Sequence, residues 1–84
     1  EMYFWATYAG AEIDLVVHRE GRLYGFEFKV TEAPAVTHSM TIALNDLGLD
    51  RVYLVYPGAL RFPLRDKIEA IGYKQLPGFR LPDP

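Results

Sequence analysis

Two alternating runs of residues flank Glu20-Gly21, and together they dictate a β-hairpin. Residues 13–18 and 22–30 are rich in β-branched and aromatic side chains, which favour strands. Gly21 supplies the backbone freedom that a tight hairpin turn needs. A turn centred between residues 20 and 21 pairs residues whose numbers add up to 41. This register places Asp14 opposite Glu27, and Glu12 opposite Lys29.

The hairpin is therefore expected to carry a charged patch on one face. Residues two apart on a strand point to the same face, so Glu12 and Asp14 would lie beside Glu27 and Lys29. The opposite face would carry the apolar side chains of Ile13, Leu15, Val17, Phe26 and Phe28. Like charges directly opposite each other are destabilising unless something compensates them.

A divalent cation is one such compensation. Mg²⁺ is held by one or two carboxylates plus water molecules, and Mn²⁺ is an equivalent choice. A lysine beside the ion can orient an attacking water or balance charge on a phosphate. The sequence thus predicts a metal site at Asp14, Glu27 and Glu12, with Lys29 as the cation. The alternative is an ordinary polar face exposed to solvent.

Length and composition limit the rest of the interpretation. The chain has 84 residues, 50% of them hydrophobic and 24% charged, which predicts one small globular domain over residues 1–84. There is no cysteine, so disulfides and thiolate metal sites are excluded. No apolar run approaches the roughly 20 residues of a membrane span. The chain reads as a fragment of a longer cytoplasmic protein.

Charge is distributed unevenly. Residues 1–50 contain three basic and eight acidic side chains, whereas residues 51–84 contain six basic and three acidic ones. A basic C-terminal part beside an acidic patch would suit a polyanion, and Arg61, Arg65 and Lys67 are the candidate nucleic-acid contacts. The net charge of -2 argues against strong non-specific DNA binding by these residues alone.

The remaining elements follow from periodicity. Residues 3–8 predict a strand that joins the hairpin in an antiparallel β-meander. Thr31 is a candidate cap and Pro34 suits a first helical turn. A helical stripe then follows at Val36, Met40, Ala43, Leu44 and Leu47, and Gly48 is typical of a helix C-terminus.

Residues 51–56 are almost entirely apolar or aromatic, which predicts a parallel strand buried on both faces. Together with the preceding strand and helix they would form a right-handed β-α-β crossover. Residues 61–64 are loop-like, residues 67–73 predict a short helix or an edge strand, and residues 74–84 predict an irregular tail. The expected fold is α/β, with a mixed sheet of about four strands.

Two motifs carry a family resemblance. They are Gly10-Ala11-Glu12-Ile13-Asp14 and, twelve residues after Asp14, Phe26-Glu27-Phe28-Lys29. Followed by a β-α-β unit, they resemble the PD-(D/E)xK restriction-endonuclease-like core without its first helix. Residues 3–73 are similar, more closely, to a domain at the C-terminus of prokaryotic AAA-type P-loop ATPases.

The resemblance implies Asp14 and Glu27 as metal ligands and Lys29 as the cation that faces water or phosphate. It implies Glu12 as a further ligand or as an outer group. The expected function is a Mg²⁺-dependent nuclease acting on DNA, with an upstream ATPase domain as partner. One alternative is a non-catalytic interaction module of such an ATPase. A third is a homodimer formed through an exposed sheet edge.

Overall fold

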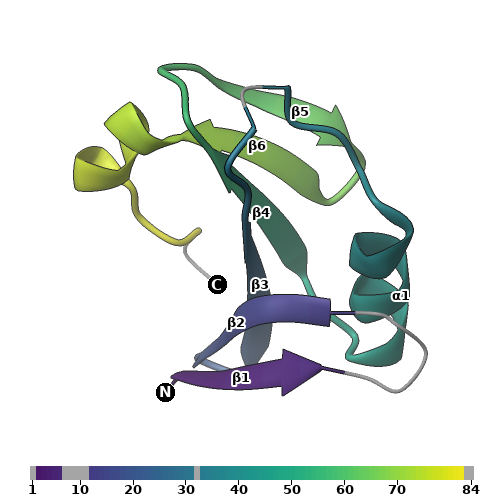
Figure 1. Cartoon of the computed structure of the whole chain (residues 1–84). Coiled ribbons are helices and arrows are strands. Elements are labelled where there is room, and N and C mark those ends of the chain that lie inside the picture. Colours follow the sequence, from purple (N-terminus) through teal and green to yellow (C-terminus); the bar gives the residue numbers. More distant parts are fainter. Residues whose placement is uncertain (1, 7–11, 32, 83–84) are drawn as a thin grey trace.

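In the part of the chain that the computed structural model describes, a six-stranded mixed sheet carries one α-helix on one face (Figure 1). The structure describes the backbone of residues 2–6, 12–31 and 33–82, and the side chains of residues 13–31 and 33–82. The strands are β1 (Met2–Ala6), β2 (Glu12–Arg19), β3 (Arg22–Phe28), β4 (Arg51–Tyr56), β5 (Arg61–Arg65) and β6 (Ile68–Gly72). The mixed α/β class is confirmed, whereas the expected number of strands is too small.

The order of strands across the sheet is β1-β2-β3-β4-β6-β5. The first three strands form the expected antiparallel meander, and β3 is parallel to β4. Strand β6 is parallel to β4 on its other side, and β5 closes the sheet antiparallel to β6. The first strand was expected over residues 3–8, of which residues 7 and 8 lie outside the described residues.

The turn between β2 and β3 has the predicted position. Glu20 and Gly21 have φ angles of 50° and 80°, and two successive positive φ values are what a two-residue type I′ turn requires. The strands pair in the predicted register, from Arg19 opposite Arg22 to Leu15 opposite Phe26. The turn chemistry therefore sets the register of the hairpin.

The helix α1 (His38–Asp46) begins later than the sequence predicts. Its N-cap is Thr37, whose hydroxyl accepts a hydrogen bond from the Met40 N–H at 3.3 Å. The prediction of Thr31 and Pro34 at the helix start is wrong, and residue 32 lies outside the described residues. Residues 33–37 lead across to α1, which packs against β2 and β4, the strands on either side of β3 (Figure 1).

The C-terminus of α1 is where the sequence predicts it. Gly48 has a φ angle of 63°, and the Leu49 N–H donates to the Leu44 carbonyl at 3.0 Å. This is the Schellman arrangement, in which a residue with positive φ ends the helix and the next N–H satisfies a free carbonyl. Both leucines also belong to the core beneath α1.

The sheet is packed on both faces. The face beneath α1 carries buried residues from the helix, from the loop that follows it and from the three strands β2, β4 and β6: Ile13, Val16, Met40, Ala43, Leu49, Val52, Leu54 and Ile68. The opposite face carries Tyr24, Phe26, Tyr53, Val55 and Ile71, against which Phe79 and Leu81 of the C-terminal segment pack. Strand β4 contributes to both clusters, as its nearly continuous apolar sequence predicts.

The C-terminal third is more regular than the sequence predicts. Residues 61–65 form β5, so the prediction of a loop over residues 61–64 is wrong. Of the two alternatives for residues 67–73, a short helix or an edge strand, a strand forms at residues 68–72, but it lies inside the sheet between β4 and β5 and not at its edge. Residues 73–78 form the 3₁₀ helix η1 (Tyr73–Gly78), so part of the expected irregular tail is helical. Among the described residues, no helix has the length and apolar character that crossing a membrane requires.

Candidate functional site

A β-bulge in β2 decides where the first predicted acid lies. Tyr3 and Trp5 of β1 pair with Val16 and Ile13 of β2, so two steps along β1 match three steps along β2. The extra residue lies at Asp14-Leu15, and it places Ile13 and Val16 in the same cluster beneath α1. The prediction that Ile13 shares a face with Leu15 is therefore wrong, because a bulge interrupts the alternation.

The bulge turns the Asp14 carboxylate onto the main chain of β3. The regular ladder between β2 and β3 ends at Leu15 opposite Phe26, so Asp14 and Glu27 are not a ladder pair. Instead, Oδ2 of Asp14 accepts a hydrogen bond from the Phe28 N–H at 2.7 Å. The Asp14 side chain is thereby bound to the main chain of Phe28, the residue between Glu27 and Lys29, although Asp14 and Glu27 do not pair across the strands as expected.

Glu27 and Lys29 form an ion pair. The Lys29 Nζ lies 3.2 Å from Oε2 of Glu27, whose side chain is only 12% exposed. Glu27 pairs with Leu54 of β4, a residue of the core beneath α1, so Glu27 faces that side of the sheet. An ionised carboxylate that is largely buried needs a partner charge, and Lys29 supplies one.

Glu12 has a different neighbour from the expected one. It pairs with Ala6 of β1, whereas the ladder with β3 stops before reaching it and β3 ends at Phe28. The predicted pairing of Glu12 with Lys29 is therefore wrong. The side chain of Glu12 lies outside the described part of the chain, as do the motif residues Gly10 and Ala11.

The side chains at this site offer hard oxygen donors. Within residues 13–31 and 33–82, no three His, Asp or Glu side chains converge closely enough to hold a metal ion. Mg²⁺ in proteins commonly keeps several water ligands and uses only one or two carboxylates. Asp14 and Glu27 match that smaller requirement in number and in chemistry.

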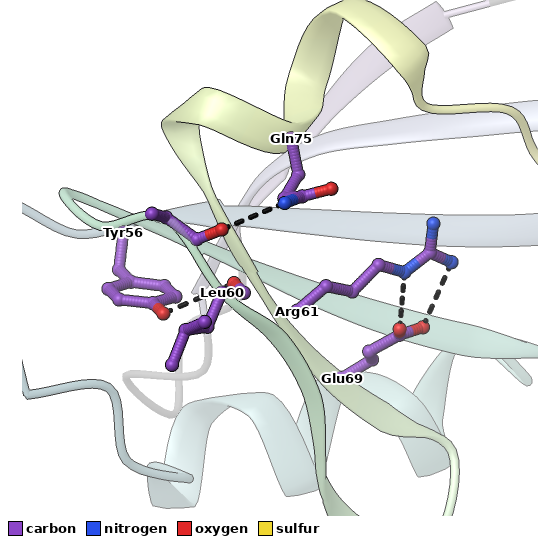
Figure 2. Close-up of polar contacts among 6 residues, drawn as sticks. Tyr56, Leu60, Arg61, Glu69 and Gln75 are labelled. Atoms are coloured by element: carbon purple, nitrogen blue, oxygen red, sulfur yellow. Dashed lines mark hydrogen bonds and ion pairs between the residues drawn. The ribbon is translucent and has the colours of Figure 1, made fainter.

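The predicted nucleic-acid contacts lie on β5 and in the turn that follows it, with β4 and β6 between β5 and β3. Arg61 binds both carboxylate oxygens of Glu69, at 2.5 and 3.3 Å (Figure 2), and its guanidinium lies 5.2 Å from the centre of the Phe79 ring. The hydrogen bond to Glu69 raises the pKa of Arg61 further above its usual range. Arg65 and Lys67 are exposed near the turn between β5 and β6. Nucleic-acid binding by these three residues stays a prediction.

One residue near the site was missed at the sequence level. The Tyr73 hydroxyl donates a hydrogen bond to the main-chain carbonyl of Lys29 at 3.0 Å. The two residues are 44 positions apart, and Tyr73 follows β6, whose place inside the sheet was not predicted. No local pattern could have brought them together.

The chain matches one family model and two curated proteins. The family model, described as "Domain of unknown function (DUF4143)", matches residues 1–76. The chain is 48% identical over 75 residues to "Uncharacterized protein Rv2008c" of Mycobacterium tuberculosis and to "Uncharacterized protein Mb2031c" of Mycobacterium bovis. Each match covers 89% of this chain and 17% of the relative. No solved structure matches the chain. Because the family model covers most of the chain, the chain belongs to the DUF4143 family.

Proposed function

We propose that this chain is a metal-dependent nuclease-like domain that acts on DNA phosphodiesters. The observation that carries the proposal is the hydrogen bond of 2.7 Å between Oδ2 of Asp14 and the Phe28 N–H. This bond ties one carboxylate to the residue between Glu27 and Lys29, which are themselves an ion pair. Asp14 on β2 and the pair of Glu27 and Lys29 at the end of β3 are thus linked through the main chain of Phe28.

The arrangement of elements supports the same proposal. An antiparallel meander leads into a helix and then into a parallel strand. An acid lies on the second strand and Glu-x-Lys at the end of the third. We propose that these elements form a restriction-endonuclease-like core. The relatives are much longer than this chain, which covers 17% of their length, and a location in a longer ATPase is consistent with that difference.

The proposed chemistry divides among three side chains. Asp14 and Glu27 would bind Mg²⁺ or Mn²⁺ through carboxylate oxygens. When bound, such an ion lowers the pKa of a water ligand and stabilises charge on a phosphate. Lys29 would place its ammonium near the phosphate oxygens and balance the charge that develops there. Its ion pair with Glu27 restricts where that ammonium lies.

The same contacts favour a second candidate, a non-catalytic interaction module. Asp14 already accepts a main-chain hydrogen bond, and Lys29 already balances Glu27. Each side chain therefore has a structural use that needs no metal. Metal binding separates the two candidates, because only the nuclease requires a saturable site at Asp14 and Glu27.

Cleavage of supercoiled plasmid with Mg²⁺ or Mn²⁺ tests the catalytic proposal, in the natural protein that carries these residues. We expect Asp14→Asn and Lys29→Ala to lower the cleavage rate about 100-fold or more, the usual effect of removing one electrostatic contact from a reacting centre. Asp46→Asn, an exposed acid at the end of α1, is the matched control. Equal rates in wild type and Lys29→Ala would refute the proposal.

Titration with Mn²⁺ tests the metal site independently of turnover. Asp14→Asn keeps an oxygen that can accept the hydrogen bond from the Phe28 N–H, but it removes the charge. We therefore expect this variant to remain folded and to lose saturable Mn²⁺ binding. Absence of saturable binding in the wild type would support the interaction module instead.

A further inference from the structure

An open pocket of about 500 Å³ lies beyond the ends of β4 and β6. It is lined by Pro57, Gly58, Ala59, Tyr73 and Lys74. Strands β4 and β6 are parallel neighbours that end at Tyr56 and Gly72. The lining residues therefore follow directly after the carboxyl ends of two parallel strands. Open α/β sheets bind their ligands outside the carboxyl ends of their strands. The volume is in the range of small-ligand pockets.

The pocket and the proposed nuclease site lie at the same end of the sheet. Strand β3 is parallel to β4 and ends at Phe28, so Lys29 lies at the same end of the sheet. Tyr73, which lines the pocket, donates through its hydroxyl to the Lys29 carbonyl at 3.0 Å. A molecule in the pocket would thus lie within one side chain of the main chain of Lys29.

The walls of the pocket are held together before any ligand binds. A Cβ at Gly72 would lie 2.3 Å from the Gly58 carbonyl oxygen, so only glycine permits this close approach. Main-chain hydrogen bonds join Gly72 to Leu60 and Lys74 to Gly58. The Gln75 amide donates to the Ala59 carbonyl at 2.8 Å (Figure 2). A site ordered in advance loses less free energy on binding.

The lining combines two side-chain rings, of Pro57 and Tyr73, with a cation. The prolyl ring of Pro57 and the Tyr73 ring, in a residue that is 43% exposed, offer surfaces for an aromatic ligand. The exposed Lys74 offers an ammonium. Proteins that bind single-stranded nucleic acid use this combination, with bases stacked on aromatic rings and cations beside phosphates.

We propose that this pocket binds one nucleotide of single-stranded DNA, with its base on Tyr73 and its phosphate at Lys74. The inference rests on the proposed function, because it assigns the nucleotide to the strand that the Asp14, Glu27 and Lys29 site would cleave. Tyr73 and Lys74 position the strand.

Binding of a fluorescently labelled single strand of roughly 12 nucleotides, measured by anisotropy in EDTA, tests the inference without requiring the metal site. We expect Tyr73→Ala to weaken binding about tenfold, which corresponds to about 1.4 kcal/mol. Tyr73→Phe keeps the ring and should bind within about twofold of the wild type. Lys74→Gln should lower the salt dependence of log K by about 0.7, the effect of one lost phosphate contact.

Leu76→Ala, an exposed apolar residue of the same 3₁₀ helix that does not line the pocket, is the matched control. Unchanged binding in folded Tyr73→Ala, or an equal loss in Leu76→Ala, would overturn the inference. Equally tight duplex binding with the same loss in Tyr73→Ala would overturn the assignment to a single strand. If Tyr73→Ala and Lys74→Gln bind the single strand as tightly as the wild type while the protein cleaves DNA with metal, the pocket inference is wrong and the proposed nuclease function stands. Weakened binding without cleavage supports the pocket and removes only the nuclease.

Discussion

Adding a methyl group at Gly25 should destabilise this chain, because the space above this residue is already filled. A Cβ there would lie 2.9 Å from Cδ1 of Leu49 and 3.1 Å from Cγ1 of Ile13. Carbon atoms pack best at about 3.5–4.0 Å, so both neighbours would have to retreat. Leu49 is 3% exposed and Ile13 is 2% exposed. Neither can move without displacing other core residues.

The expected cost follows from two opposing effects. Overpacking a core costs about 1–3 kcal/mol. Replacing glycine by alanine returns about 0.4–1 kcal/mol, because the unfolded chain loses conformational freedom. We expect Gly25→Ala to lower the free energy of unfolding by about 1 kcal/mol, which corresponds to a fall in melting temperature of about 4–8 °C for a domain of this size.

Thermal and denaturant unfolding measure this effect. Gly78→Ala is the matched control, because a Cβ at Gly78 meets no atom within 4 Å and should stabilise the chain by about 0.4–1 kcal/mol. In Gly25→Ala/Leu49→Val the nearest clashing atom is removed, so the double variant should lose less stability than the two single variants combined. A melting temperature of Gly25→Ala at or above that of the wild type would refute the packing of Ile13 over Gly25.

Two further predictions concern stability. Thr37→Ala should destabilise the chain by about 1 kcal/mol, because it removes the N-cap of α1, whereas Thr31→Ala should have little effect; equal losses in urea unfolding would contradict the observed helix start. The Tyr53 hydroxyl is buried without a hydrogen-bond partner in the described part of the chain, and burial raises the pKa of Tyr53. The folded state therefore favours the neutral phenol. The stability that this preference contributes is fully present below the unfolded pKa of about 10, and it is lost as the pH rises through the higher pKa of the folded state. Tyr53→Phe should reduce the alkaline loss of stability and raise the free energy of unfolding at neutral pH by about 1 kcal/mol; an unchanged alkaline profile would show that another group causes it.

Elements with strong local signals were predicted well. The two positive φ angles at Glu20-Gly21 follow from turn chemistry alone, and Gly48 ends α1 where a glycine is expected. Strand β4 has the predicted bounds because its apolar run is continuous. The start of α1 and the place of β6 were wrong. Both depend on where the chain meets the rest of the sheet, and Thr31 and Thr37 are equally good caps by residue type.

For the candidate site, the residue types and the hairpin register could be predicted from the sequence, because both depend on neighbours along the chain and on one two-residue turn. The contacts of Asp14 were not. They require the β-bulge in β2, which is defined by the pairing of β2 with β1. That bulge lets Ile13 fill the space left by Gly25 beneath α1. Tyr73 reaches Lys29 for the same kind of reason, because only the assembled sheet brings the carboxyl ends of β3 and β6 to one edge. Side-chain positions at this edge thus result from packing between distant segments, which no local pattern encodes.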